Sequence, residues 1–126
     1  MVVKDSFDYV KARAFLSEKA KHQAEKRCRL WHQAVLDTKH IVNMVIEEFT
    51  PLRILQWGSV LNEKDFSEIS DIDLAIEGVD SVLFMRLQEK AEKMTKFPLD
   101  LLRWEDVDPC FRRLLKKKGC IIYEKR

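Results

Sequence analysis

Two short stretches decide the fold of this chain: residues 53–59, RILQWGS, and residues 70–76, SDIDLAI. The first is an apolar run that ends in a Gly-Ser turn, and the second begins with two aspartates separated by one isoleucine. On a β-strand, residues i and i+2 point to the same side, so Asp71 and Asp73 would project together while the neighbouring apolar residues pack the other way. The sequence therefore predicts a strand, a turn and a second strand that presents two carboxylates on one face.

Paired carboxylates of this kind favour a cation site. Two carboxylates held close together repel each other, which raises the pKa of one of them unless a divalent cation lies between them. Oxygen ligands suit a hard ion, and Mg²⁺ is usually held by one or two carboxylates together with substrate phosphates and water. A third acid, Asp100, lies in a later apolar run and would join Asp71 and Asp73 if its strand lay beside theirs. The alternative interpretation of the Asp-x-Asp pair is a turn before a strand, with both acids on the surface.

The Gly-Ser turn suits a phosphate. Glycine lets backbone N–H groups approach a phosphate closely, and serine adds a hydroxyl donor, so Gly58 and Ser59 are candidates for nucleotide binding.

The N-terminal third of the chain predicts helix. Residues 5–48 contain no Gly or Pro and are rich in Ala, Lys, Glu, Arg and Leu, with Asp5 or Ser6 as the N-cap. The pattern fits either one long helix or two helices that break near residues 17–23. In the second half, apolar residues recur in three-then-four steps and predict a buried face. These residues are Cys28, Trp31, Val35, Val42, Val45 and Phe49, with Thr38 filling one position.

Strands and helices alternate after Pro51, because the residue before a proline is disfavoured in helix and the first helix must end there. We expect one α+β domain over residues 1–126, in which a small mixed β-sheet packs against helices. Residues 1–49 form a long N-terminal helical segment and residues 50–126 a sheet-containing core. The expected strands are 53–57, 71–77, 97–103 and 120–123, and the expected helices are 80–95 and 110–117.

Composition gives little global indication of a partner. The net charge of +2 comes from 23 basic and 21 acidic residues, but residues 11–29 hold seven Lys or Arg against two Glu, and residues 111–118 hold five with no acid. Such clusters are either solvated helix faces or surfaces for phosphates or an acidic partner. Three widely spaced cysteines without a CxxC pattern argue against a disulfide framework and a zinc site. With no signal peptide or membrane span in the sequence, we expect a cytoplasmic protein and no membrane partner.

Four pieces in order, WGSV, SDIDLAI, PLDLL and LLKKKGCIIYEKR, resemble the minimal nucleotidyltransferases of the DNA polymerase β superfamily. The signature of that family is a Gly-Ser turn, a spacer of about ten residues, an Asp-x-Asp pair and a third acid on a later strand. The likeness covers roughly residues 40–126. It implies the nucleotidyltransferase fold, with Asp71, Asp73 and Asp100 as catalytic ligands of two Mg²⁺ ions, and with Gly58 and Ser59 as the turn that binds the nucleotide phosphates.

The chain departs from that family pattern in two respects. Eleven residues, 60–70, separate Ser59 from Asp71, and the basic stretch usual after the serine is replaced by residues 60–64, VLNEK. An arginine near the triphosphate would neutralise charge and orient the leaving group. Lys64 is the nearby basic candidate for this role, and its alternative is a solvated loop residue.

The resemblance implies transfer of a nucleoside monophosphate from ATP or another NTP to a hydroxyl acceptor. Small stand-alone members of the family resemble antitoxins that pair with a helical HEPN-type protein, so a partner protein is the expected acceptor. The N-terminal helix would supply a surface for that partner or for self-association into a homo-oligomer. The alternative function is a catalytically degenerate protein that binds or neutralises a partner, and a weaker one is a nucleic-acid binder that uses residues 11–29.

Overall fold

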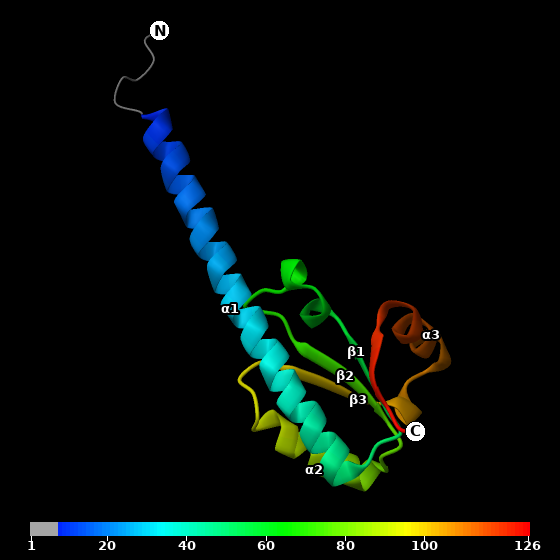
Figure 1. Ribbon diagram of the computed structural model, residues 1–126. Helices are drawn as coiled ribbons and strands as arrows, with labels where there is room; N and C mark the ends of the chain where they lie inside the picture. Colours follow the sequence, from blue (N-terminus) through cyan, green and yellow to red (C-terminus); the bar gives the residue numbers. More distant parts are fainter. Residues whose placement is uncertain (1–7) are drawn as a thin grey trace.

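A computed structural model describes residues 8–126 and shows an α+β architecture (Figure 1). Within these residues, three α-helices accompany a four-stranded sheet, which confirms the expected fold class and the long N-terminal helix. The helices are α1 (Tyr9–Phe49), α2 (Ser81–Glu92) and α3 (Pro109–Lys118), and the strands are β1 (Arg53–Trp57), β2 (Ile72–Glu77), β3 (Leu99–Arg103) and β4 (Cys120–Glu124). Short 3₁₀ turns are η1 (Ser59–Leu61), η2 (Glu63–Asp65) and η3 (Trp104–Asp106).

The sheet is mixed and has the strand order β3-β2-β1-β4. Strand β1 runs antiparallel to both β2 and β4, whereas β2 and β3 are parallel. Parallel neighbours need a crossover connection, and α2 supplies it between β2 and β3. The sheet therefore sets β2 and β3, which carry the acidic residues, side by side.

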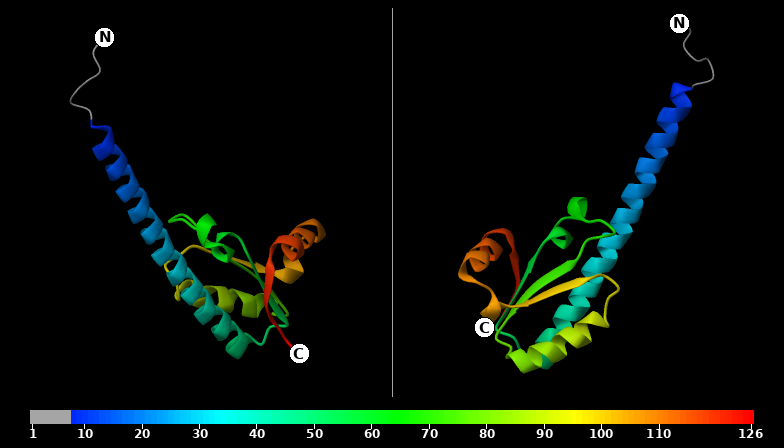
Figure 2. Two further views of the ribbon diagram at one scale, coloured as in Figure 1. Left: turned by 45° about the horizontal axis from the view of Figure 1, so that its top comes forward. Right: turned by 180° about the vertical axis from the view of Figure 1, so that it is seen from behind.

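Helices cover both faces of the sheet. Helices α1 and α2 pack on one face and α3 on the other, as Figures 1 and 2 show from several directions. Alternation along β2 separates the two cores, because Leu74 and Ile76 pack under α1 and α2 while Ala75 packs with Trp104 and Leu115 on the α3 side. Strands β1, β2 and β3 thus contribute to both apolar layers, whereas β4 packs on the side of α1 and α2.

Helix α1 is continuous, which settles the choice between one helix and two. Its buried residues all lie in the C-terminal half: Ala34, Asp37, Thr38, Ile41, Val42, Met44 and Val45. The predicted buried face is confirmed at positions 38, 42 and 45, while Trp31, Val35 and Phe49 are half-buried at its margin. The buried stripe is wider than the predicted line of residues, because α1 contacts both the sheet and α2, and such a stripe spans about 100° or more of the helix surface.

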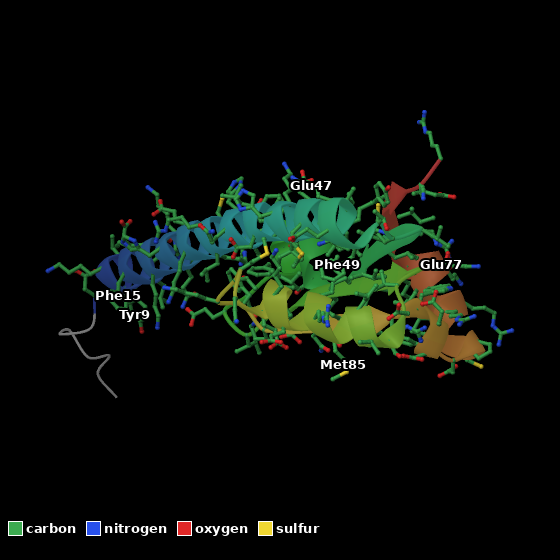
Figure 3. The ribbon with its side chains drawn as sticks, turned by 90° about the horizontal axis from the view of Figure 1, so that it is seen from below. Tyr9, Phe15, Glu47, Phe49, Glu77 and Met85 are labelled. Atoms are coloured by element: carbon green, nitrogen blue, oxygen red, sulfur yellow. The ribbon has the colours of Figure 1, made fainter. Side chains whose placement is uncertain are left out.

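The first part of α1 extends beyond the domain. Residues 9–27, referred to below as the arm, are exposed except for the half-buried Ala12. In Figure 3, Phe15 lies at the opposite end of the helix from Phe49. The described helix begins after Asp8, whose carboxylate accepts hydrogen bonds from the N–H groups of Val10 and Lys11; the predicted caps at positions 5 and 6 lie outside the described residues. No helix within residues 8–126 has the length and apolar character needed to cross a membrane.

Two predicted boundaries differ from the structure by a few residues. The helix expected to reach Thr95 ends earlier, because the Thr95 hydroxyl donates to the carboxylate of Asp37 (2.7 Å) and accepts from the N–H of Phe97 (3.1 Å), which fixes a turn there. The strand expected to begin at Phe97 begins after Pro98, since proline has no N–H to donate to a ladder. Both differences follow from side-chain chemistry that periodicity does not register.

Candidate active site

The sheet brings the three predicted acids to neighbouring positions. Asp73 on β2 is paired in register with Asp100 on β3, and Asp71 lies just before β2 rather than within it. The residues that flank Asp73 are buried under α1 and α2, so its side chain lies on the α3 face of the sheet. Asp71 and Asp73 are half-buried and Asp100 is exposed, which leaves the group accessible from solvent.

The Gly-Ser turn lies directly against this acid group. Trp57, the last residue of β1, is paired with Asp73, so Gly58 follows beside that carboxylate. Gly58 has φ +84°, a conformation that residues with a Cβ rarely adopt. A Cβ at this position would lie 2.1 Å from Oδ2 of Asp73. Glycine is therefore required both by the backbone turn and by the close approach of the carboxylate.

Burial and the two neighbouring carboxylates act together on Asp73. Burial, followed by the negative charges of Asp100 and Asp71, raises the pKa of Asp73 to about 6. Desolvation and like charges both disfavour the ionised form, and a cation or a bound proton relieves both effects. Near neutral pH this group of acids therefore favours uptake of positive charge.

The donor set fits a hard divalent cation by its chemistry. It consists of carboxylate oxygens, which are the ligands that Mg²⁺ prefers, and their mutual repulsion supplies a reason for the ion to bind. Within residues 8–126, however, no three His, Cys, Asp or Glu side chains are already spaced as a metal site. Within the described residues, Asp100 and Asp71 therefore act on Asp73 through their charge without forming a ready-made three-residue metal site.

The two remaining predicted site residues, Ser59 and Lys64, make no described hydrogen bond or ion pair with the three aspartates. Ser59 is half-buried at the start of η1, and its hydroxyl makes no hydrogen bond to any of residues 8–126, so it can donate to a ligand. Lys64 is exposed in η2, where its backbone N–H donates to the side chain of Asn62 (3.1 Å). Its ammonium forms no ion pair with an acid in the described part of the chain, so the structure gives no sign that Lys64 belongs to the site.

An aromatic pair, Trp57 and Phe111, borders the acids. Because Trp57 is paired with Asp73, their side chains lie on the same face of the sheet. The Trp57 ring meets Phe111 of α3 edge to face, with 6.4 Å between ring centroids. No local sequence pattern signals either contact, because the first depends on the register between β1 and β2 and the second on how α3 docks.

The basic residues of α3 are partly committed to structure. The Arg112 guanidinium donates to the backbone carbonyl of Trp104 (2.9 Å) and lies over the Trp104 ring. The ammonium of Lys116 also lies over that ring. These contacts fix α3 on the sheet rather than leaving its charge free for a phosphate.

Comparison of the chain with models of known protein families and with curated proteins gives no match in either case.

Proposed function

We propose that this protein is a Mg²⁺-dependent nucleotidyltransferase that moves a nucleoside monophosphate from ATP or another NTP to a hydroxyl group of a partner protein, with release of pyrophosphate. The observation that carries the proposal is the juxtaposition of Asp73, Asp100 and Asp71 with the Gly58 turn. Phosphoryl transfer needs little covalent chemistry from the protein and depends on positioning and charge neutralisation. A glycine turn for phosphates beside an acid group for metal ions supplies both within one small sheet, in keeping with the nucleotidyltransferase fold.

Each residue has a defined part in the proposal. Asp71 and Asp73 hold the cations, and Asp100 completes the site and accepts the proton of the acceptor hydroxyl. Gly58 and Ser59 bind the phosphates through backbone N–H groups and the free serine hydroxyl. Two bound Mg²⁺ ions would supply Lewis-acid neutralisation of the phosphate charge. Trp57, beside Asp73, limits access of water from the α3 side.

The arm provides the docking surface for the acceptor in this proposal. Its exposed apolar side chains include Val10 (79% exposed), Phe15 (68%) and Leu16 (62%). The arm carries six Lys or Arg against two Glu, an excess of four positive charges. Two arms side by side would bring these charges together, so charge complementarity favours an acidic protein over a second copy. An acidic helical protein of the HEPN type, to which the sequence resemblance points, is the proposed acceptor.

A labelling experiment tests this function. The purified chain is incubated with ATP labelled at the α-phosphate, with Mg²⁺, and with proteins that co-purify with it from its own cells. We expect label on an acidic partner, and we expect Asp71→Asn to abolish transfer while the distant control Glu47→Gln leaves it intact. Deletion of residues 1–27 should reduce transfer without reducing binding of ATP, because the arm lies outside the acid site. Label that persists in Asp71→Asn would contradict the proposed role of the acids.

A second candidate is a binding module without catalysis, and two observations favour it. No three candidate ligands in residues 8–126 are spaced as a metal site, and Lys64 forms no ion pair with the acids. Two results together would favour the binding module over the transferase. The partner would bind to the arm of Asp71→Asn as well as to that of the wild type, and the wild type would transfer no label at any Mg²⁺ concentration. Light scattering of the chain alone and a salt titration with RNA distinguish self-association and nucleic-acid binding from both.

A further inference from the structure

A cavity lies on the face of the sheet opposite the acids, between α1 and strands β1 and β4. Its volume is about 360 Å³, within the range of about 300–1,000 Å³ that is typical of small-molecule pockets. Its apolar walls come from Val35 and Val42 of α1, Val60 of η1 and Ile122 of β4. Four separate elements thus enclose a space that none of their side chains fills.

Gln56 gives this cavity its polar floor. The residue is only 8% exposed on the central strand β1, and it lines the cavity. Its side-chain amide has no hydrogen-bond partner among residues 8–126, although it is not sealed off from the cavity. An amide that is reached only through the cavity pairs with water or with a ligand there. Its position suits a group that enters the cavity and pairs with it.

The mouth of the cavity is polar and positively charged. Lys39 and Asn43, both exposed residues of α1, border it, and the hydroxyl of Thr38 lies on the same wall. The Thr38 hydroxyl donates to the carbonyl of Ala34 (2.7 Å) and keeps an acceptor position free. From inside to outside, a ligand would meet an amide, then valine and isoleucine walls, then an ammonium group.

We infer that this cavity binds a small amphipathic anion, with a compact apolar body, a polar group that pairs with Gln56 and an anionic group that reaches Lys39. Water alone would satisfy the amide but would leave the apolar walls hydrated, whereas such a ligand covers the walls and satisfies both polar ends. The inference does not depend on the proposed transferase activity, since the cavity shares no side chain with the acid site.

The backbone connects the cavity to the Gly-Ser turn at Gly58 and Ser59. Gln56 precedes Gly58 by two residues, and Val60 follows it by two. The Trp31 indole N–H donates to the carbonyl of Val60 (2.8 Å), so α1 holds the turn segment from the cavity side. A ligand in the cavity would therefore contact the segment that positions Gly58, and the Trp31 indole resonance offers a direct readout.

Binding of indole-3-propionate, measured by ¹H–¹⁵N NMR titration of the full chain, tests the inference. This probe has an apolar ring, an N–H group and a carboxylate on a short tether. We expect saturable shifts of the Gln56 carboxamide, Val60 and Trp31 indole signals, with a dissociation constant below about 1 mM. Its methyl ester, which lacks the charge, should bind about threefold more weakly.

Three variants then locate the site. Gln56→Leu should weaken binding about fivefold, through loss of one hydrogen bond, and Lys39→Gln about threefold. Val42→Phe should abolish binding by filling the space, while Lys19→Gln on the arm should have no effect. Lys39 is exposed, so its variant remains informative if a core substitution disturbs folding. Absence of saturable shifts, or binding that all these variants leave unchanged, would overturn the inference.

Discussion

Substitution of Asp73 by asparagine should stabilise the metal-free protein at neutral pH. In the folded state, burial and the charges of Asp100 and Asp71 raise the pKa of Asp73 from 3.8 to about 6. Because each tenfold change in proton affinity is worth about 1.36 kcal/mol, this rise in pKa corresponds to about 3 kcal/mol. That value is the upper bound on the free-energy cost of ionising Asp73 in the folded state. Because Asp73 remains partly accessible to water, screening reduces this to about 1.5 kcal/mol.

The sign of the pH dependence follows from the raised pKa. Well below pH 4, the Asp73 carboxyl is protonated in both the folded and unfolded states, so it makes no electrostatic contribution to the free energy of unfolding. Between pH 4 and pH 6 the unfolded chain loses this proton first, so the free energy of unfolding falls as pH rises. Above pH 6 the full penalty is present. Asparagine has the same shape without the charge, so the advantage of the variant should grow from near zero at pH 4 to about 1.5 kcal/mol at pH 7.5.

Urea unfolding at pH 4, 5, 6 and 7.5, in buffer with EDTA, measures this difference directly. A gain of about 1.5 kcal/mol corresponds to a rise in Tm of about 5 °C for a domain of this size. Glu47→Gln, a change at an exposed acid far from the site, serves as the matched control and should show no pH-dependent difference. If Asp73→Asn were less stable than the wild type at pH 7.5, or if its advantage did not change with pH, the electrostatic account of the acid group would be wrong.

Three further outcomes are expected. Millimolar Mg²⁺ should raise the Tm of the wild type at pH 7.5 but not at pH 4.5, where Asp73 is protonated, and scanning fluorimetry of Asp73→Asn should show little of this rise. Gly58→Ala should lower the free energy of unfolding in urea by about 2–4 kcal/mol, because the alanine Cβ would meet Asp73 and the residue has a positive φ. In an Asp73→Ala background only the backbone contribution remains, so the loss should be about 1–2 kcal/mol. Deletion of residues 1–27 should lower the Tm by less than about 3 °C, since the ion pair between Lys26 and Glu68 that it removes is exposed; a loss of 10 °C or more would show that the arm supports the core.

The strands could be predicted from sequence wherever strong local signals bounded them. Strand β1 was predicted at its observed limits because Pro51 and Gly58 enclose an apolar run of five residues. The face shared by Asp73 and its i+2 neighbours followed from the two-residue repeat of a strand. The pairing of Asp73 with Asp100 was conditional on the third strand lying beside the second, and the parallel register confirms that arrangement.

Helix faces were harder to predict, because their burial depends on what each helix meets. Helical spacing over residues 80–95 predicts a buried face of Val82, Leu83, Leu87 and Ala91 or Met94. In α2, Leu87 and Ala91 are buried, but Val82 and Leu83 are exposed and Phe84 takes their place in the core. Helical spacing fits either set, and only the position of α2 on the sheet selects between them. The cavity below α1 was likewise beyond sequence reasoning, since its volume depends on the separation between α1 and β4 rather than on any local pattern.

The cost of the acid group bears on the choice between an enzyme and a binding module. A module that only binds a partner has no use for a partly buried Asp73 beside two further carboxylates, because burial and repulsion both make its ionised form lower the stability of the domain at neutral pH. The same fold would gain stability from a single asparagine, and Gly58 would then be needed for its φ alone rather than for the approach of a carboxylate. Destabilising arrangements of this kind concentrate at functional sites, where a ligand that binds the folded state offsets the cost. The destabilised Asp73 and the glycine that accommodates its carboxylate therefore favour a cation-binding transferase over a module that has lost its chemistry.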